Sequence, residues 1–307
     1  MLDSILISGY GWSGSGLLID ILKSNPRFYQ FPIEIRHIKD EGGLIDLYQS
    51  KTIFKYAESI NKFTKLSKVL SRKNGLLYGM NYNKLSGGSF KYLCDDFLNK
   101  LRQEATFKSD AFVFNYYNSM VETFFWKLQR KLDLNSRYSI YSMPPSIESL
   151  ESQIIDFNLK FTKSLSTQKI VILDQAIDPI QWDEFKWMFP NSKMISIDRD
   201  PRDIYCDYQN SRDVKFKVMD FIEYFKKSRS INHITEGDYL ELKFEDIIHN
   251  YRKTMTDVFS FVGEKDPFEC KYDLSKSLNN IGIHKRFGPR EEIDIIGNKL
   301  RDFLWLD

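Results

Sequence analysis

The chain has 307 residues, of which 42% are hydrophobic and 15% aromatic, so it can bury a large core. Its net charge of +2 is too close to neutral for a general nucleic-acid binder, and we expect no nucleic acid among its partners. Three cysteines and four histidines lie at scattered positions that fit neither a disulfide framework nor a metal-ligand spacing. We therefore expect no metal site.

The same features bear on location. No apolar run reaches ~18 residues, so we expect no integral membrane segment. The first apolar stretch begins almost at Met1, which leaves no room for a signal peptide. Together with the unpaired pattern of cysteines, this predicts a cytoplasmic protein.

The first informative stretch joins an apolar run at residues 4–8 to a glycine-serine turn at residues 9–16 and an apolar-periodic helix at residues 17–22. Glycines let a backbone come close to a ligand, and the N–H groups and positive dipole end of a helix start attract an anion. We therefore predict a strand, a phosphate-binding loop and a helix. The expected binding residues are Trp12, Ser13, Gly14, Ser15, Gly16 and Leu17.

Other interpretations of this loop exist. Gly9, Gly11 and Gly14 spell G-x-G-x-x-G, and Glu34 follows twenty residues later, as in a Rossmann-type NAD-dependent oxidoreductase. The spacing also suits a P-loop, but Ser15 and Gly16 replace the lysine and hydroxyl residues of an ordinary ATPase or kinase. A solvent-facing turn without a ligand is the simplest alternative.

A second motif follows an apolar strand pattern at residues 193–198 and reads Arg199-Asp200-Pro201-Arg202-Asp203. Pro201 ends the strand, and Arg199 carries a fork of donors that suits a phosphate. Alone, such a string also fits a surface turn with salt bridges. Combined with the N-terminal loop, it resembles the sulfotransferases that use 3′-phosphoadenosine 5′-phosphosulfate (PAPS).

The resemblance implies both a fold and an activity. We expect an α/β fold with three layers, a mostly parallel central sheet and a P-loop-like nucleotide site, in one domain over residues 1–307. The implied reaction moves a sulfuryl group from PAPS to a hydroxyl, or an amine, of a carbohydrate-like acceptor such as a glycan or small molecule. The product would be adenosine 3′,5′-bisphosphate (PAP), with the first loop on the 5′-phosphosulfate and Arg199 on the 3′-phosphate. Such transfer relies on positioning and charge and requires no metal.

The acceptor side of the reaction is expected after a second strand at residues 28–35. The resemblance makes Glu34 the candidate base, with His37 in reserve and Arg36 as a cation beside the reaction. In the simpler alternative, Glu34 and Arg36 form an ordinary ion pair and His37 is a surface side chain.

Residues 47–163 have a mostly helical pattern, which we interpret as an insertion on the acceptor side. Aromatic residues concentrate in residues 112–126, where most are expected in a core. The α/β rhythm then resumes with strand patterns at residues 169–173 and 239–243. The segment 244–247 (FEDI) resembles a Y-E-D-L segment of the sulfotransferases.

A basic segment at residues 279–286 precedes the last helix. The resemblance implies that Lys285 and Arg286 close over the nucleotide and add cations to it. An exposed basic approach to the helix is the alternative.

Two positions depart from the sulfotransferase pattern. Trp12 stands where most members have a lysine or arginine that steadies the sulfuryl group, so the cation would come from Arg36, Lys285 or Arg286. Asp207 stands where many members have a serine that binds the 3′-phosphate, and a carboxylate there would repel the ligand unless it points away. Both departures also suit a non-catalytic nucleotide-binding relative.

Overall fold

The computed structural model describes residues 2–50, 52–73, 79–102, 106–109, 120–132, 139–211, 215–230, 237–264 and 272–305. By internal contacts it divides into an α/β unit, Met1–Arg36 with Thr162–Asp307, and a helical unit, His37–Phe161. Cys270 and residues 112–119 of the aromatic stretch lie outside the described residues.

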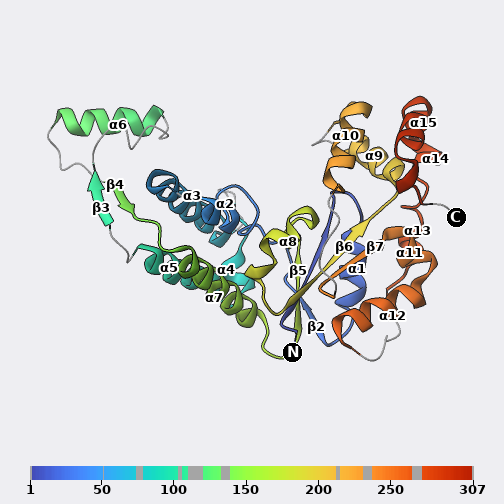
Figure 1. The fold of residues 1–307 in the computed structure, drawn as a ribbon, viewed down its shortest axis with the longest axis horizontal. Helices are drawn as coiled ribbons and strands as arrows, with labels where there is room; N and C mark the ends of the chain where they lie inside the picture. The colour runs from blue at the N-terminus through green and yellow to red at the C-terminus, as the bar shows by residue number, and fades with distance from the viewer. Residues whose placement is uncertain are drawn as a thin grey trace. The chain divides into compact units, whose positions relative to one another are not determined.

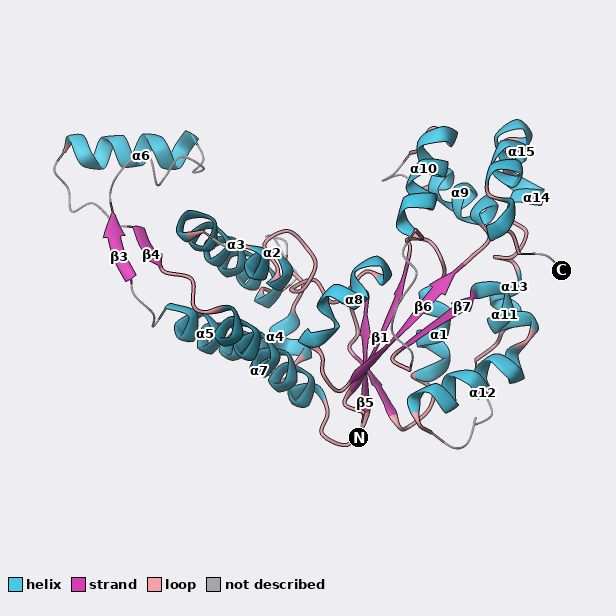
Figure 2. Cartoon of the chain, viewed as in Figure 1, coloured by secondary structure: helices cyan, strands magenta, loops and turns pink. Residues whose placement is uncertain are grey.

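The α/β unit is built on a parallel sheet, which in the described residues has five strands in the order β2-β5-β1-β6-β7 (Figure 2). The strands are β1 (Ser4–Gly9), β2 (Phe28–Gln30), β5 (Ile170–Asp174), β6 (Ser192–Asp198) and β7 (Tyr239–Lys243). The predicted α/β class with a parallel sheet is confirmed. Because all strands run the same way, their carboxyl ends meet at one edge, with β1 at the centre of that edge.

Both faces of the sheet are covered. Ile5 and Ile7 of β1 join a buried cluster with α1 and α12, while Leu6, which points to the opposite face, is also fully buried. Val171 and Met194 on the neighbouring strands are equally buried and lie outside that cluster. Near-continuous apolar strands of this kind belong to sheets with helices or chain on both faces, which gives the three layers.

Two groups of helices in the α/β unit each share a buried cluster (Figure 1). One buried cluster joins α1, α11 and α12 to the sheet, and a second joins α9, α10 and α15 beyond the end of β6. The helices are α1 (Ser15–Leu22), α8 (Trp182–Phe185), α9 (Pro201–Asn210), α10 (Val218–Ser228), α11 (Phe244–His249), α12 (Tyr251–Val262), α13 (Ser275–Leu278), α14 (His284–Phe287) and α15 (Arg290–Lys299).

The second strand is shorter than predicted. β2 ends at Gln30, whereas the sequence pattern suggested a strand through residue 35. Pro32 has no N–H to give to a ladder, so the regular pairing stops before it. Two backbone bonds still tie the segment to β5, from the Phe31 N–H to Ile172 at 3.2 Å and from the Ile35 N–H to Asp174 at 2.8 Å.

The helical unit is mainly α-helical, but it also contains an antiparallel pair of short strands that the sequence pattern does not indicate (Figure 2). The two strands have four residues each, too few for a clear period-2 signal. The elements are α2 (Leu44–Gln49), α3 (Ile53–Ser71), α4 (Tyr82–Leu85), α5 (Ser89–Arg102), β3 (Thr106–Ser109), α6 (Met120–Lys131), β4 (Ser139–Ser142) and α7 (Ile147–Leu165), which continues into the α/β unit.

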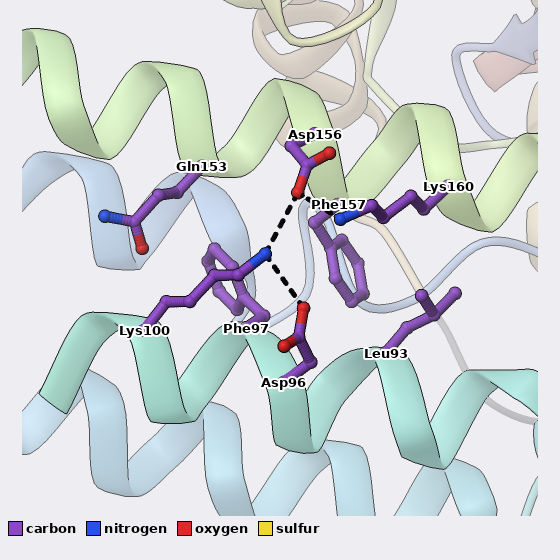
Figure 3. A pocket seen from close by; sticks show the side chains of 8 residues that line it. All are labelled: Leu93, Asp96, Phe97, Lys100, Gln153, Asp156, Phe157 and Lys160. Atoms are coloured by element: carbon purple, nitrogen blue, oxygen red, sulfur yellow. Dashed lines mark hydrogen bonds and ion pairs between the residues drawn. The ribbon is translucent and has the colours of Figure 1, made fainter. Parts of the chain in front are cut away.

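Charged side chains join α5 to α7 within the helical unit (Figure 3). Lys100 lies 2.9 Å from Asp96 on its own helix and 3.2 Å from Asp156 on α7, and Asp156 also bonds Lys160 at 2.7 Å. The cavity beside them holds about 10 Å³, room for about one water molecule. This cluster fastens two helices and offers no substrate pocket.

Candidate functional site

The loop after β1 has the geometry of an anion site. Gly14 is the N-cap of α1 at φ 86°, and a Cβ there would come within 2.4 Å of the Phe244 ring, so only glycine fits. The Leu17 N–H donates a hydrogen bond to the Gly14 carbonyl at 3.0 Å. Gly16 faces open space, with nothing within 4 Å of a Cβ built on it. An anion at this helix start would meet the N–H groups of α1 that precede Leu17, and the positive end of the helix dipole.

Trp12 is held in an unusual backbone conformation within this loop. Its φ of 49° lies in the left-handed region that residues other than glycine rarely adopt. The Arg199 Nη1 donates to the Trp12 carbonyl at 3.0 Å, and the indole ring lies 4.3 Å from the Tyr208 ring. Strain of this kind persists only where the surroundings hold it, and it concentrates at functional sites.

The end of β5 contributes a residue that no sequence motif indicates. Gln175 has φ 55°, and its Nε2 donates to the Ser15 hydroxyl at 3.2 Å. This bond fixes the hydroxyl at the first position of α1. The nearest sequence signal is the polar pair Asp174-Gln175 directly after a buried strand, which marks the same edge of the sheet.

Arg199 is the centre of the second half of the site. It is 3% exposed, and its guanidinium donates to the Asp207 carboxylate at 2.6 Å and to the Asn280 carbonyl at 2.5 Å, besides the carbonyl of Trp12. It also lies 5.1 Å from the Phe244 ring. A surface salt-bridge turn is excluded because this arginine is buried. Arg199 thereby connects the end of β6 to the loop after β1 and to the C-terminal segment.

Two other motif residues, Asp200 and Asp203, stabilise the segments that Arg199 connects. Asp200 caps α9, accepting from the Arg202 N–H at 2.9 Å, and binds the Arg202 side chain at 2.6 Å. Asp203 accepts from the backbone N–H groups of Gly282 and His284 and contacts His284 Nδ1 at 2.5 Å. Burial alone would raise the pKa of Asp203, but the bonds from His284 outweigh it and lower that pKa. These bonds hold the C-terminal segment in place beside Arg199.

The residue before the motif is also fully charge-compensated. Asp198 is 1% exposed and accepts from Arg229 at 2.5 Å and from Lys243 at 2.8 Å. Burial would raise its pKa, yet the two cations hold the pKa below its ordinary value. The Arg229 guanidinium lies over the Tyr10 ring at 4.1 Å, so this ion cluster supports the loop from the side of β7.

Glu245 is a buried carboxyl that no sequence motif assigns to the site. It is fully buried at the start of α11, and its Oε1 accepts the Asp200 N–H at 2.9 Å. Among the described residues, its Oε2 has no hydrogen-bond partner. Burial raises the pKa of Glu245 to about 7. The sequence signal was the FEDI segment, which marks the strand end without indicating a role.

Glu34 and Arg36 form an ion pair of 2.5 Å, with side chains 44% and 42% exposed. The ordinary ion pair, which was the simpler alternative for these two residues, is therefore present. It leaves Glu34 at the carboxyl edge, because the Ile35 N–H is bonded to the end of β5. β5 lies between β2 and β1, so Glu34 and the loop are separated by two strand spacings, roughly 10 Å.

The strand order argues against the Rossmann interpretation. In that fold the strand after the glycine loop and helix lies next to β1, which lets its terminal acid reach the ribose. Here β1 pairs with β5 and β6, and β2 pairs with β5. Glu34 is therefore on the wrong strand for the ribose contact, although Gly9, Gly11 and Gly14 match the glycine pattern.

His37 does not lie at the surface, and it is not accessible as an alternative base. It is fully buried in the helical unit among aromatic rings, and among the described residues its nitrogens have no hydrogen-bond partner. Burial lowers the pKa of His37 to about 3. A proton acceptor must reach its substrate, so His37 is no longer a candidate base. The rings within about 6 Å belong to Tyr82, Phe90, Phe157 and Phe161.

The cations proposed for the closing segment are exposed. Lys285 and Arg286 lie on α14, and the Arg286 guanidinium bonds the Asn279 carbonyl and contacts that of Ile281 at 3.5 Å. The bonds of Asp203 to Gly282 and His284 hold the segment's backbone in place. Both cations are therefore at the surface of a fixed segment at the carboxyl edge.

Other possible sites contribute little. In the part of the chain that the structure describes, no group of three or more His, Cys, Asp or Glu side chains could hold a metal, and no helix is long and apolar enough to cross a membrane. A pocket of about 820 Å³ lies at the opposite edge of the sheet, beside the first residues of β1 and β5. It includes Arg27 and Glu264, which pair with each other at 2.5 Å, and none of the loop residues.

The parallel sheet, whose central strand β1 leads through a glycine-rich loop into α1, defines an α/β protein. No family model matches the sequence, and no curated protein matches it. The sulfotransferase domain of the Synechococcus PCC 7002 olefin synthase is similar at TM-score 0.43 and 15% identity, over 95% of this chain and 86% of that one. A Mycobacterium avium sulfotransferase is similar at TM-score 0.43 and 11% identity, over 100% and 78%. The sulfotransferase domain of the curacin pathway scores 0.38 at 12% identity, over 87% and 75%.

Proposed function

We propose that this protein transfers a sulfuryl group from PAPS to a hydroxyl, or an amine, of a carbohydrate-like acceptor and releases PAP. At the similarities given above, the function has to be inferred from the side chains of the site. The proposal rests on the two sequence motifs and on the way that their residues are joined at the carboxyl edge.

The single observation that carries the proposal is the double role of Arg199. Its Nη1 bonds the carbonyl of Trp12 in the anion loop, so the guanidinium stands directly beside that loop. A ligand with two phosphate groups on one ribose needs two such anion sites close together. The open space above Gly16 suits the 5′-phosphosulfate, and the Arg199 fork suits the 3′-phosphate.

PAPS supplies an activated sulfuryl group when bound. In this proposal, Glu34 takes the proton of the acceptor hydroxyl, the acceptor oxygen forms the new S–O bond, and the bond between sulfur and the phosphate oxygen breaks. The first N–H groups of α1 stabilise the charge that develops on the leaving phosphate. Trp12 cannot supply a cation, so the exposed Lys285 and Arg286 are the proposed sources of positive charge, with Arg36 on the acceptor side.

The proposal is tested by replacing the arginine. Arg199→Ala is expected to weaken PAP binding by ~1.5 to 3 kcal/mol, the worth of charge-assisted hydrogen bonds, and to leave AMP binding nearly unchanged. Isothermal titration calorimetry with both nucleotides measures this. Arg252→Ala, which removes an exposed arginine of α12, is the matched control. Equal losses for the two nucleotides would show that Arg199 does not bind the 3′-phosphate.

A further inference from the structure

We propose that Asp207 is a built-in counter-anion that occupies the phosphate position on Arg199 and is displaced when a ligand anion binds. The inference rests on the proposed function in one respect, since it takes that ligand anion to be the 3′-phosphate of the nucleotide. It makes Asp207 a specificity-determining residue of the same site.

Arg199 is a buried cation that needs a counter-charge. The Arg199 side chain is 4% exposed, and a buried cation without a counter-charge is strongly unfavourable. Asp207, at 2.6 Å, supplies that charge. The other carboxylates of this edge have different partners: Asp198 binds Arg229 and Lys243, Asp200 binds Arg202, Asp203 binds His284, and Glu245 accepts a backbone N–H. Asp207 is therefore the carboxylate that pairs directly with Arg199.

Asp207 also lies where a bound phosphate would contact Arg199. The Arg199 Nη1 is shared between the Asp207 carboxylate and the Trp12 carbonyl, so the acid lies at the side of the guanidinium that adjoins the anion loop. A phosphate placed between loop and arginine needs the same donor. Two anions at one donor repel each other, so the ligand and Asp207 exclude one another from this position.

The Asp207 side chain also has access to solvent. Its side chain is 29% exposed, whereas that of Arg199 is 4% exposed. The carboxylate can therefore rotate into water when a phosphate takes its place, while the guanidinium stays buried on the Phe244 ring. Among the described residues the Arg199 Nε has no hydrogen-bond partner, so the arginine keeps an additional donor.

Asp207 should therefore weaken the binding of the 3′-phosphate selectively. Binding of the 3′-phosphate must replace an existing ion pair, so it gains less than it would at an uncompensated arginine. A nucleotide without that phosphate, such as AMP, leaves the pair intact and is unaffected. The exchange also explains how an acid can stand at this position in a phosphate site: it stabilises the protein before the ligand arrives.

The variant Asp207→Asn keeps the shape and removes the charge. Without added anions it is expected to lower the melting temperature by roughly 5–10 °C, because Arg199 loses its counter-charge. Inorganic phosphate, titrated against chloride at equal ionic strength, should restore most of this loss, with a much smaller effect on the wild type. The variant should also bind PAP about 10-fold more tightly and AMP unchanged. The matched control is Asp257→Asn, which removes an exposed acid of α12.

The outcomes separate the two proposals. If phosphate fails to restore the variant, or if PAP binds equally or more weakly than to the wild type, Asp207 does not occupy a ligand position and the inference is overturned. If phosphate restores the variant but neither protein prefers PAP to AMP, the counter-anion is established and the 3′-phosphate assignment of the proposed function fails. If the wild type prefers PAP and the variant gains nothing, only the counter-anion role fails.

Discussion

The cluster around Arg199 and the cluster around His37 are both buried, and both contain residues that the sequence marks as functional. At the carboxyl edge, buried ionic groups form pairs of opposite charge, such as Arg199–Asp207 and Arg229–Asp198. Around His37, aromatic rings pack against the imidazole, and burial keeps it neutral near neutral pH. The first environment keeps its buried groups charged, whereas the second suppresses charge.

This difference teaches that residue type alone does not locate chemistry. Histidine titrates near neutral pH in water, but desolvation has moved the pKa of His37 to about 3, outside the useful range of a base. Glutamate titrates well below neutrality in water, but burial has moved the pKa of Glu245 to about 7. The surroundings have thus made the glutamate, and not the histidine, the group that titrates near neutral pH.

The largest expected effect concerns Glu34, which stands at the charged edge but is only half-buried. Glu34→Gln keeps the shape and removes the basicity, so turnover should fall by ~100-fold or more, the typical worth of a general base, with little change in PAP affinity. Release of PAP from PAPS measures turnover, and calorimetry measures affinity.

A matched control separates catalysis from the loss of an ion pair. Glu223→Gln removes an exposed acid that pairs with Lys227 at 2.7 Å, as Glu34 pairs with Arg36. It should leave turnover unchanged. If Glu34→Gln instead weakened nucleotide binding, and residual turnover tracked that loss, Glu34 would be a nucleotide ligand and the reaction would need another base.

The next effect concerns the buried acid of the charged edge. Native Glu245 holds its proton up to about pH 7, whereas the unfolded chain releases it near pH 4.5. The native state therefore binds more protons between these values, and stability falls as the pH rises through this window, by about 3 kcal/mol in total. Glu245→Gln keeps the acceptor for the Asp200 N–H and should lack this loss.

Denaturant titrations at a series of pH values across that window measure the difference. The stability of the Gln variant relative to the wild type should grow from pH 4.5 to pH 7. Glu291→Gln, an exposed position on α15, should run parallel to the wild type. Parallel curves for Glu245→Gln as well would mean that Glu245 ionises in the native state like a solvated acid.

The smallest effect belongs to the aromatic cluster and has the opposite sign. The pKa of His37 is about 3 when native and 6.5 in the ordinary case, so the unfolded chain binds more protons between these values. Stability should fall as the pH drops, by about 2 kcal/mol between roughly pH 6.5 and pH 5. His37→Phe should remove this acid sensitivity, while His249→Phe, at an exposed site of α11, should not. An unchanged acid slope in His37→Phe would place a charged or solvated imidazole in the native cluster.

The sequence could predict the parts of the site that depend on local pattern. β1, the loop and α1 follow from one continuous stretch, and the end of β6 follows from Pro201. The partners of Arg199 could not be predicted, because the Asn280 carbonyl is 81 residues away and depends on how the C-terminal segment folds back. The burial of His37 likewise depends on rings from α4, α5 and α7. The early end of β2 was readable from Pro32, but the apolar residues on both sides concealed it.

The central claim is that one nucleotide meets two anion sites, the loop before α1 and the Arg199 fork. A thermal-shift comparison of adenosine 3′,5′-bisphosphate, AMP and NAD with the wild-type protein tests it most directly, since a ligand that binds the native state raises stability according to its affinity. We expect the bisphosphate to raise the melting temperature clearly more than AMP at equal concentration, even against the competition of Asp207. Equal shifts with the two nucleotides, or a larger shift with NAD, would contradict the claim.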